Sequence, residues 1–200
     1  MLTAVVFDFG EVLVETGPAF LYRKIFPTDE EMRFFLEKIL TQPLRSSWHS
    51  GACVGDEVQR LAARHPEYAE AILAFHSRFI ETVRGPIEGM PELVHEMKAR
   101  GMRLYGLTNW AKDTFSVVPE AFPFLRLLDD VIVSGMVGVK KPDPAVFDLA
   151  IRRFQLDPAT SLFTDDKQTN VDAAARAGFR AVRFENAAQL RAAIGQHGAD

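Results

Sequence analysis

The sequence predicts an α/β fold, a Rossmann-like parallel sheet with helices on both faces, joined to a small helical unit. Three observations indicate it. From residue 87 onward, short apolar runs alternate with amphipathic stretches, as strands and helices do in parallel α/β proteins. An earlier apolar run at 4–7 is followed by Asp8 and Gly10, which is typical of a buried parallel strand. Between these regions, residues 15–85 carry apolar side chains at helical spacing, and no strand is evident.

Five strands and four longer helices are expected around the sheet. The strands are expected at 4–7, 102–107, 130–133, 161–163 and 180–184, and the helices at 91–100, 144–154, 170–177 and 187–194. Gly101 and Gly178 follow two of these helices as stop signals. Pro144 stands in the first turn of a third, where its missing N–H does no harm. A short helix is expected after Trp110.

The segment 15–86 is expected to form a helical unit between two parts of the core, 1–14 and 87–200. Pro27, Pro43 and Gly51 mark the breaks between its helices. Residues 15–18 and 85–86 are expected to be the outgoing and returning linkers. Because this unit is inserted directly after the first strand, we expect it to stand over the carboxyl ends of the strands, as a lid stands over a site.

The composition indicates a soluble, compact protein and disfavours several classes of function. A net charge of −4, without a basic stripe, gives no reason to expect a nucleic-acid partner. The first apolar run is broken by Asp8 and no stretch is long enough to cross a bilayer, so neither a secretion signal nor a membrane span is expected. The single cysteine, Cys53, cannot form an internal disulfide, which suits a reducing cytoplasm. We therefore expect a cytoplasmic protein; the oligomeric state is not predicted.

Polar residues stand where four of the expected strands end. They are Asp8, Thr108-Asn109, Lys141 with its loop, and Asp165-Asp166. The carboxyl ends of parallel strands meet in one crevice, so these side chains are expected to lie together. Taken singly, each has a structural explanation: a turn, a helix cap or a solvated surface lysine. Taken together, adjacent carboxylates would repel one another unless a cation neutralises them.

The ordered set resembles the haloacid dehalogenase-like hydrolase superfamily over nearly the whole chain. The four motifs of that family match residues 7–12, 107–109, 141–144 (with Phe147) and 163–166 (followed by Asn170). Each motif alone is weak, but the ordered quartet is specific. The helices inserted after the first motif resemble the small helical cap of the family.

The resemblance implies a role for each polar residue. Asp8 is expected to attack phosphorus and form an aspartyl-phosphate, while Thr108 and Lys141 bind phosphoryl oxygens. Mg²⁺, which prefers hard oxygen ligands, is the expected cofactor. Its expected ligands are carboxylates and one backbone carbonyl: Asp8, Gly10 (carbonyl), Asp165 and Asp166. Asn170 is expected to orient Asp166 or a metal-bound water.

Three further residues are candidates for contact with a small phosphorylated substrate. Asn109 is expected to bind the substrate from the turn that follows its strand. Its neighbour Thr108 stands at the same strand end. Trp48 and His49 lie in the break before Gly51 and are expected to face the substrate from the cap. For Trp48, an equally good interpretation is that the indole fills the core of the cap.

The chain departs from the usual phosphatase pattern at Gly10. Most phosphatases of this superfamily have a second aspartate there, which protonates the leaving oxygen and later activates water. Such acid–base catalysis is typically worth about 10²–10⁴-fold. Three substitutes are open: the carboxyl group of Glu11, a leaving group that needs little protonation, or a cap residue such as His49.

The resemblance therefore favours a Mg²⁺-dependent phosphatase for a small phosphometabolite. A subgroup with glycine at this position points to sugar phosphates. A metal-independent 2-haloacid dehalogenase also lacks the second aspartate, but it lacks the acidic pair Asp165-Asp166 as well. A phosphonate-cleaving branch would need a buried cap lysine, for which Lys24 and Lys38 are available. A non-catalytic phosphate-binding protein is the remaining alternative, because Gly10 is consistent with lost turnover.

Overall fold

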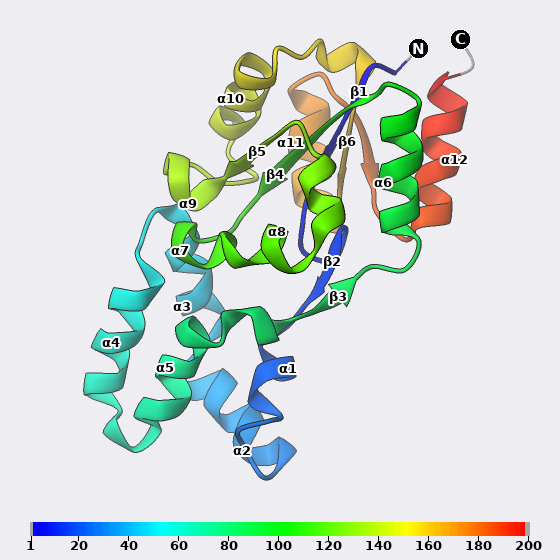
Figure 1. The fold of residues 1–200 in the computed structure, drawn as a ribbon. Coiled ribbons are helices and arrows are strands. Elements are labelled where there is room, and N and C mark those ends of the chain that lie inside the picture. Colours follow the sequence, from blue (N-terminus) through cyan, green and yellow to red (C-terminus); the bar gives the residue numbers. More distant parts are fainter. Residues whose placement is uncertain (1, 199–200) are drawn as a thin grey trace.

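The computed structural model describes residues 2–198 and contains a five-stranded parallel sheet (Figure 1). The strand order is β5-β4-β1-β6-β7. The strands are β1 (Ala4–Phe7), β4 (Arg103–Thr108), β5 (Asp130–Val133), β6 (Ser161–Asp165) and β7 (Arg180–Arg183). Every neighbouring pair in this sheet is parallel, so all five carboxyl ends lie at one edge. The predicted α/β class and parallel sheet are confirmed.

The central strand β1 is inaccessible to solvent along its whole length, which explains its continuous apolar sequence. Ala4 and Val6 pack on one face of the sheet, and Val5 and Phe7 pack on the other. At its end, Phe7 pairs in register with both neighbouring strands, and the backbone N–H of Asp8 donates to the carbonyl of Thr164 at 2.9 Å. The position of Asp8 is therefore set by two ladders.

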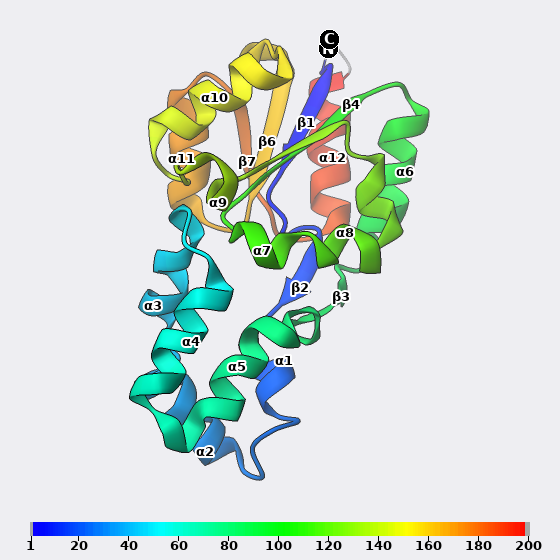
Figure 2. The same ribbon diagram turned by 60° about the vertical axis from the view of Figure 1, so that its left-hand side comes forward.

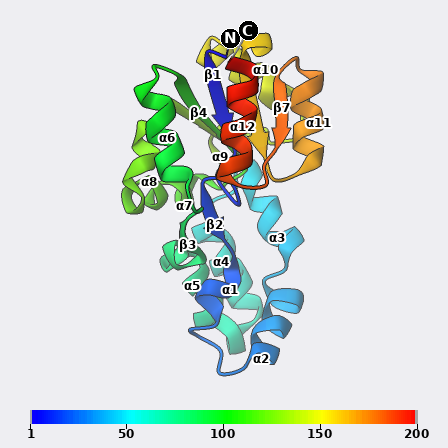
Figure 3. The ribbon, with the colours of Figure 1, turned by 90° about the vertical axis from the view of Figure 1, so that its right-hand side faces the viewer.

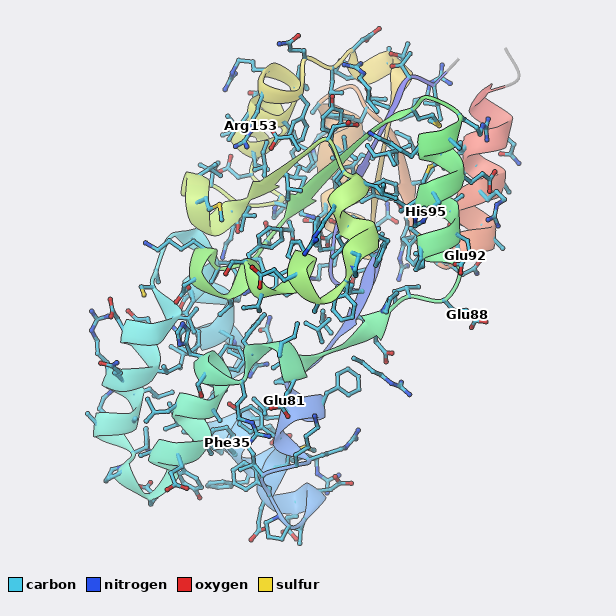
Figure 4. The ribbon with its side chains drawn as sticks, viewed as in Figure 1. Phe35, Glu81, Glu88, Glu92, His95 and Arg153 are labelled. Atoms are coloured by element: carbon cyan, nitrogen blue, oxygen red, sulfur yellow. The ribbon has the colours of Figure 1, made fainter. Side chains whose placement is uncertain are left out.

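Helices cover both faces of the sheet. α10 (Pro144–Phe154) and α11 (Gln168–Arg176) cover one face, and α6 (Met90–Ala99) and α12 (Ala187–Gly198) cover the other, which is turned toward the viewer in Figure 3. Arg153 of α10 lies beside β5 (Figure 4), where it donates to both carboxylate oxygens of Asp130 at 2.7 Å. Short helices α7 (Lys112–Phe115), α8 (Val117–Ala121) and α9 (Ser134–Val137) follow β4 and β5 near the carboxyl edge.

The helices between β1 and α6 gather beyond the carboxyl edge of the sheet (Figure 2). They are α1 (Pro18–Tyr22), α2 (Asp29–Phe34) with a π-helical turn (Phe35–Ile39), α3 (Gln42–Ser47), α4 (Val54–Arg64) and α5 (Ala69–Ser77). Tyr22 and Phe35 are fully buried between them, with ring centroids 4.8 Å apart (Figure 4 labels Phe35). The Tyr22 hydroxyl donates to the carbonyl of Ala71 at 3.1 Å. The helical unit thus has a core of its own.

The expectation that this segment holds no strand was wrong at its two ends. β2 (Val14–Thr16) and β3 (Val83–Pro86) form a two-stranded antiparallel ribbon that joins the helices to the sheet. The ribbon is only three to four residues long and has an irregular register between Glu15 and Thr16. So short a strand shows no alternation in the sequence, because only the return of the chain beside itself creates the pairing.

The other elements lie close to their predicted positions. The bounds of β1, β5 and α10 are as expected, and the remaining strands and long helices differ at their ends by a few residues. Pro43 is inside the first turn of α3 rather than at a break, since Thr41 caps that helix by accepting from the N–H of Leu44. Within residues 2–198, no helix combines the length and the apolar character that crossing a bilayer requires.

Candidate active site

Lys141 joins two of the expected strand-end carboxylates in one buried cluster. Its ammonium group lies 3.0 Å from Oδ1 of Asp8 and 2.6 Å from Oδ2 of Asp165. The side chains of Lys141 and Asp165 are inaccessible to solvent, and that of Asp8 is 10% exposed. Asp8 also accepts from the N–H of Phe9 at 2.7 Å. Charges this deeply buried persist only when they are paired, and here one cation serves two anions.

The loop that carries Lys141 is held by Asn109. The Asn109 amide donates to the carbonyl of Lys141 at 2.8 Å, and its oxygen accepts from the N–H of Lys141 at 2.9 Å. Both ends of this amide are therefore engaged by the backbone of one residue. Asn109 also lines the cavity described below, so its binding of substrate stays a prediction, while its side chain positions Lys141.

Asp165 is saturated with hydrogen bonds. Oδ1 accepts from the N–H of Lys167 at 2.9 Å and from Asn170 Nδ2 at 2.9 Å. Oδ2 accepts from Lys141 at 2.6 Å and from the same Asn170 amide at 3.0 Å. These four contacts match the acceptor capacity of a carboxylate. Asn170, expected to orient Asp166 or a water, instead donates to Asp165.

The two aspartates that contact Lys141 differ in their pKa values. Burial raises the pKa of Asp8 to about 6, because desolvation outweighs the attraction of Lys141 and Asp165 adds repulsion. Burial also acts on Asp165, but Lys141 and the hydrogen bonds from Lys167 and Asn170 outweigh it and lower its pKa. The pKa of Lys141 is raised, since the two carboxylates outweigh desolvation. The cluster thus contains a firm ion pair, Lys141–Asp165, and a less well neutralised carboxylate, Asp8.

The cluster fits a divalent cation. Asp8, Asp165 and Asp166 each offer a carboxylate oxygen, and these oxygens lie within 4.8 Å of one another. Three carboxylates face the single ammonium group of Lys141, and burial raises the pKa of Asp166 as well as that of Asp8. Hard oxygen donors with excess negative charge are the donor set that Mg²⁺ prefers. Gly10 lines the same cavity beside Asp8 and Asp166.

A cavity of about 290 Å³ opens beside this cluster, between the sheet edge and the helical unit. Thr108, 2% exposed at the end of β4, lines it together with Asp8. Phe75 and Phe79 from the helical unit and Trp110 from the core form an aromatic wall, with neighbouring ring centroids 5.7 Å apart. Asp8, Thr108 and Asp166 thus line one cavity, while Lys141 and Asp165 are buried beside it and do not line it.

Trp48 and His49 both line this cavity, as expected. Trp48 is 2% exposed and packs against Phe75 at a ring distance of 5.8 Å, so it both fills the cap core and borders the cavity. The pKa of His49 is lowered to about 4, first by burial and then by the nearby cations Lys140, Lys167 and Arg45. His49 is therefore neutral at pH 7.

Glu11 is committed to a structural contact. Its carboxylate accepts from the N–H of Thr16 at 2.8 Å and from the Thr16 hydroxyl at 2.9 Å, and its φ is 60°. A Cβ at Gly10 would lie 3.2 Å from that same hydroxyl. The carboxyl group of Glu11 is thus tied to the ribbon that joins core and helices, although Glu11 also lines the cavity.

Sequence reasoning missed Arg45 and Gln42, which also line the cavity. The signal was available as spacing, since Gln42, Arg45 and His49 recur at i, i+3 and i+7 on one helical face. Conversely, the two cap lysines do not line the cavity. Lys24 is exposed and pairs with Glu81 at 2.9 Å, and Lys38 is exposed, so neither fits the Schiff-base role of the phosphonate-cleaving branch.

Comparison with known proteins gives the same assignment along the chain. A family model described as haloacid dehalogenase-like hydrolase matches residues 2–178. The curated D-ribitol-5-phosphate phosphatase of Bacteroides thetaiotaomicron is 24% identical over 199 residues, covering 96% of both chains. Several other curated relatives match only locally, and the chain spans less than half of their length.

Solved structures share the fold. A HAD family enzyme from Bacteroides thetaiotaomicron, in complex with magnesium and inorganic phosphate, has a TM-score of 0.69 at 16% identity, covering 93% of this chain and 96% of that one. The L-2-haloacid dehalogenase from Xanthobacter autotrophicus, with chloropropionic acid covalently bound, has a TM-score of 0.66 at 19% identity. That match covers 98% of this chain and 83% of the dehalogenase. Phosphate-binding and dehalogenating enzymes thus share this architecture.

Proposed function

The chain belongs to the haloacid dehalogenase-like hydrolase family, and from this premise we propose that it is a Mg²⁺-dependent phosphatase with Asp8 as its nucleophile. The observation that carries the proposal is the contact of Lys141 with both Asp8 and Asp165, beside Asp166 and a cavity. A metal-free halide hydrolase has no use for a third carboxylate at this place. The full-length similarity to a ribitol-5-phosphate phosphatase supports a small phosphorylated polyol or sugar as substrate.

The first step forms a bond between a carboxylate oxygen of Asp8 and phosphorus. The P–O bond to the leaving group breaks in line, and its electron pair stays on the leaving oxygen. Lys141, 3.0 Å from Asp8, offers positive charge to a phosphoryl oxygen. Thr108 offers its hydroxyl and the N–H groups that follow it. The leaving oxygen takes a proton from solvent and departs as the alcohol. Water then attacks the aspartyl-phosphate and gives up a proton to solvent, the bond from phosphorus to Asp8 breaks, and the free carboxylate returns with inorganic phosphate.

We assign the metal to Asp8, Asp166 and the backbone carbonyl of Gly10. Asp165, which was also expected as a ligand, already accepts four hydrogen-bond contacts from three donor groups and holds Lys141 in place. When bound, Mg²⁺ supplies positive charge that offsets the repulsion between a phosphate dianion and the carboxylates.

We further propose that residues 15–86 act as a cap domain on a core of residues 1–14 and 87–200. Two features support this division. The helical unit has its own buried aromatic cluster, and only the β2–β3 ribbon continues the chain between the two parts. Closing of the cap over the cavity would exclude water from the aspartyl-phosphate until the leaving group has departed.

Phosphate release from a panel of sugar phosphates and an aryl phosphate tests the proposal. It is measured with Mg²⁺ and with a chelator, for the native protein and for Asp8→Asn. We expect turnover that requires both Mg²⁺ and Asp8. Because Gly10 supplies no acid, the rate on the aryl ester should exceed that on alkyl esters, by about 10²-fold or more. A folded, metal-loaded protein that releases no phosphate from any ester overturns the proposal.

Gly10 also favours a second candidate, hydrolysis of a carbon–halogen bond, since a departing halide needs no proton. In that reaction Asp8 attacks carbon, and the carbon–halogen bond breaks with its electron pair on the halide. Halide release from 2-haloacids in the presence of a chelator distinguishes the two reactions. The phosphatase proposal predicts no such release.

A further inference from the structure

One helical face of the cap points its polar residues at the cavity. Gln42, Arg45, Ser46 and His49 all line it, and their spacing of i, i+3, i+4 and i+7 places them on one side of α3 and the turn after it. Asp8, from the sheet edge, lines the same cavity. Because Asp8 is the proposed acceptor of the phosphoryl group, this face of the cap is left to contact the leaving group of the substrate.

Arg45 is the charged member of this face, and it has no anionic partner. Within residues 2–198 its guanidinium makes no ion pair with a carboxylate, and the one hydrogen bond of the side chain runs from Nη1 to the carbonyl of Leu40. The guanidinium is partly buried, and burial lowers its pKa. A cation taken out of water without a counter-ion costs free energy. Such a cation at the wall of an active-site cavity fits a ligand that brings the missing anion.

Trp48, on the same turn, adds an unused hydrogen-bond donor. Its Nε1 is buried and has no partner among the described residues, although the side chain lines the cavity. Indole Nε1 can only donate, so its missing partner is an acceptor. A buried polar group left without a partner is costly and calls for an explanation. Arg45 lines the same cavity, so a ligand with anionic oxygens offers an acceptor to Trp48 and a counter-ion to Arg45.

The surroundings of His49 show that this end of the cavity is positive. Arg45, Lys140 and Lys167 all disfavour the charged form of its imidazole. Lys140 donates to the carbonyl of Ser46 at 3.1 Å, which brings its ammonium group to the cap face from the core. Cations from both the cap and the core thus gather around His49 at the wall of the cavity.

We propose that Arg45 and Trp48 form a second anion subsite, so that the substrate carries a carboxylate or a second phosphate on its leaving group. The inference rests on the phosphatase function proposed above and narrows its substrate class to phosphomonoesters with two anionic ends. The aromatic wall of Phe75, Phe79 and Trp110 lines the same cavity, so the subsite lies in the chamber that holds the scissile group.

Matched esters test the subsite. 3-Phosphoglycerate has a carboxylate where glycerol 3-phosphate has a hydroxymethyl group. In the second pair, 6-phosphogluconate has a carboxylate where glucose 6-phosphate has its aldehyde carbon. Ribose 1,5-bisphosphate against ribose 5-phosphate tests a second phosphate. A charged hydrogen-bonded contact predicts that, for a carboxylate or for a second phosphate, kcat/KM for the ester with the additional anionic group exceeds that of its partner without it by about tenfold or more.

Variants connect this preference to the residues. In Arg45→Gln the ratio of kcat/KM between the two members of a pair should fall to about one, and in Trp48→Phe it should fall part of the way. Lys38→Gln removes the same charge from an exposed position outside the cavity and should keep the native ratio. If Arg45→Gln does not fold, as judged by circular dichroism, Arg45→Lys gives the same comparison, because an ammonium group cannot reproduce the guanidinium fork.

The results of these assays distinguish a failure of the anion-subsite proposal from a failure of the phosphatase proposal. Turnover that needs Asp8 and Mg²⁺ but shows no preference within any pair overturns the subsite and leaves the phosphatase standing. If no ester is hydrolysed, the phosphatase fails, and calorimetry with the same pairs decides the subsite alone. Tighter binding of the second anion that is lost in Arg45→Gln supports it, and equal binding overturns it.

Discussion

At the residue scale, the site depends on one ammonium group, that of Lys141, which neutralises two buried carboxylates. Lys141 contacts Asp8 and Asp165, while Asn170 and the N–H of Lys167 complete the partners of Asp165. Among the described residues, Asp8 contacts Lys141 and the N–H of Phe9, fewer donors than Asp165 has. A nucleophile needs an available lone pair, so the incomplete neutralisation of Asp8 suits its proposed role. The same incomplete neutralisation means that the charged form of Asp8 destabilises the metal-free folded state.

We predict that Asp8→Asn stabilises the metal-free protein at neutral pH. The pKa of Asp8 is raised from 3.8 to about 6, so the folded state favours the protonated form. Stability from this group is therefore present below pH 4 and is lost as pH rises toward 6. Removing the charge should raise the free energy of unfolding at pH 7.5 by on the order of 2 kcal/mol.

Urea unfolding in the presence of a chelator measures this effect at pH 4.5 and pH 7.5. Asp148→Asn, on the exposed side of α10, is the matched control and should change nothing. A gain in Asp8→Asn that is equal at both pH values would contradict the explanation by charge.

Lys141→Met should abolish turnover and destabilise the protein. It leaves Asp8 and Asp165 buried and facing each other without a cation. Breaking a buried pair by removing one partner costs roughly 3–5 kcal/mol. Thermal unfolding and aryl phosphate hydrolysis measure the two effects. The double variant Lys141→Met with Asp165→Asn should recover part of the stability but none of the activity; recovery of turnover would refute a direct role for Lys141.

At the scale of elements, the cap and core are joined by more than the ribbon. α4 begins at Val54, and its N-cap residue Cys53 provides no side-chain cap. Asp113 on α7 of the core supplies one instead, accepting from the N–H of Gly55 at 3.0 Å. His76 of α5 also lies 3.2 Å from that carboxylate. A helix of the cap thus has its first turn satisfied by a residue of the core.

Asp113→Ala is expected to loosen the cap without disturbing the carboxylate cluster. Loss of a helix N-cap typically costs about 1 kcal/mol. Here that loss weakens the contact between the cap domain and the core. Hydrogen exchange should quicken in the first turn of α4 and stay unchanged in β1 and β6. Equal acceleration in the sheet would show that Asp113 supports the whole fold rather than the position of the cap.

At the scale of the whole molecule, the parallel sheet brings four separated segments to one edge. Asp8, Thr108, Lys141 and Asp165-Asp166 come from positions up to about 160 residues apart, and they meet because β1 lies between β4 and β6. An ion that binds there stabilises only the folded state, since the unfolded chain holds no such cluster.

Mg²⁺ should therefore raise the unfolding temperature of the native protein. At a concentration of 100 times Kd the gain is about 2.7 kcal/mol, and it should be greater at pH 7.5 than at pH 5, where Asp8 is protonated. Asp166→Asn should lose most of the shift. Gln168→Ala, exposed on the next helix, serves as the control and should retain it. A shift that survives in Asp166→Asn would remove that residue from the ligand set.

Much of this architecture could be predicted because its signals are local. The apolar run of β1, the glycine stops and Pro144 determine strand and helix positions from a few neighbouring residues. The family resemblance then placed Asp8 and the acidic pair at strand ends, where the structure has them, and Lys141 in a loop, which in the structure follows α9 and brings Lys141 into contact with Asp8. Gln42 and Arg45 were not predicted as cavity residues, because a polar helical face has the same sequence pattern whether it faces solvent or a cavity.

By itself, the sequence determined the fold class, the order of the elements and the residues that end each strand, because backbone propensity and burial act over short distances. Only the tertiary structure decided which hydrogen-bond partner each of the polar residues has. It assigned the amide of Asn109 to the Lys141 loop, Asn170 to Asp165, Glu11 to Thr16, and the first turn of α4 to Asp113. Each of these partners is far away in sequence or one of several equivalent choices. Hydrogen-bond geometry over a few ångströms selects among them once the chain has folded.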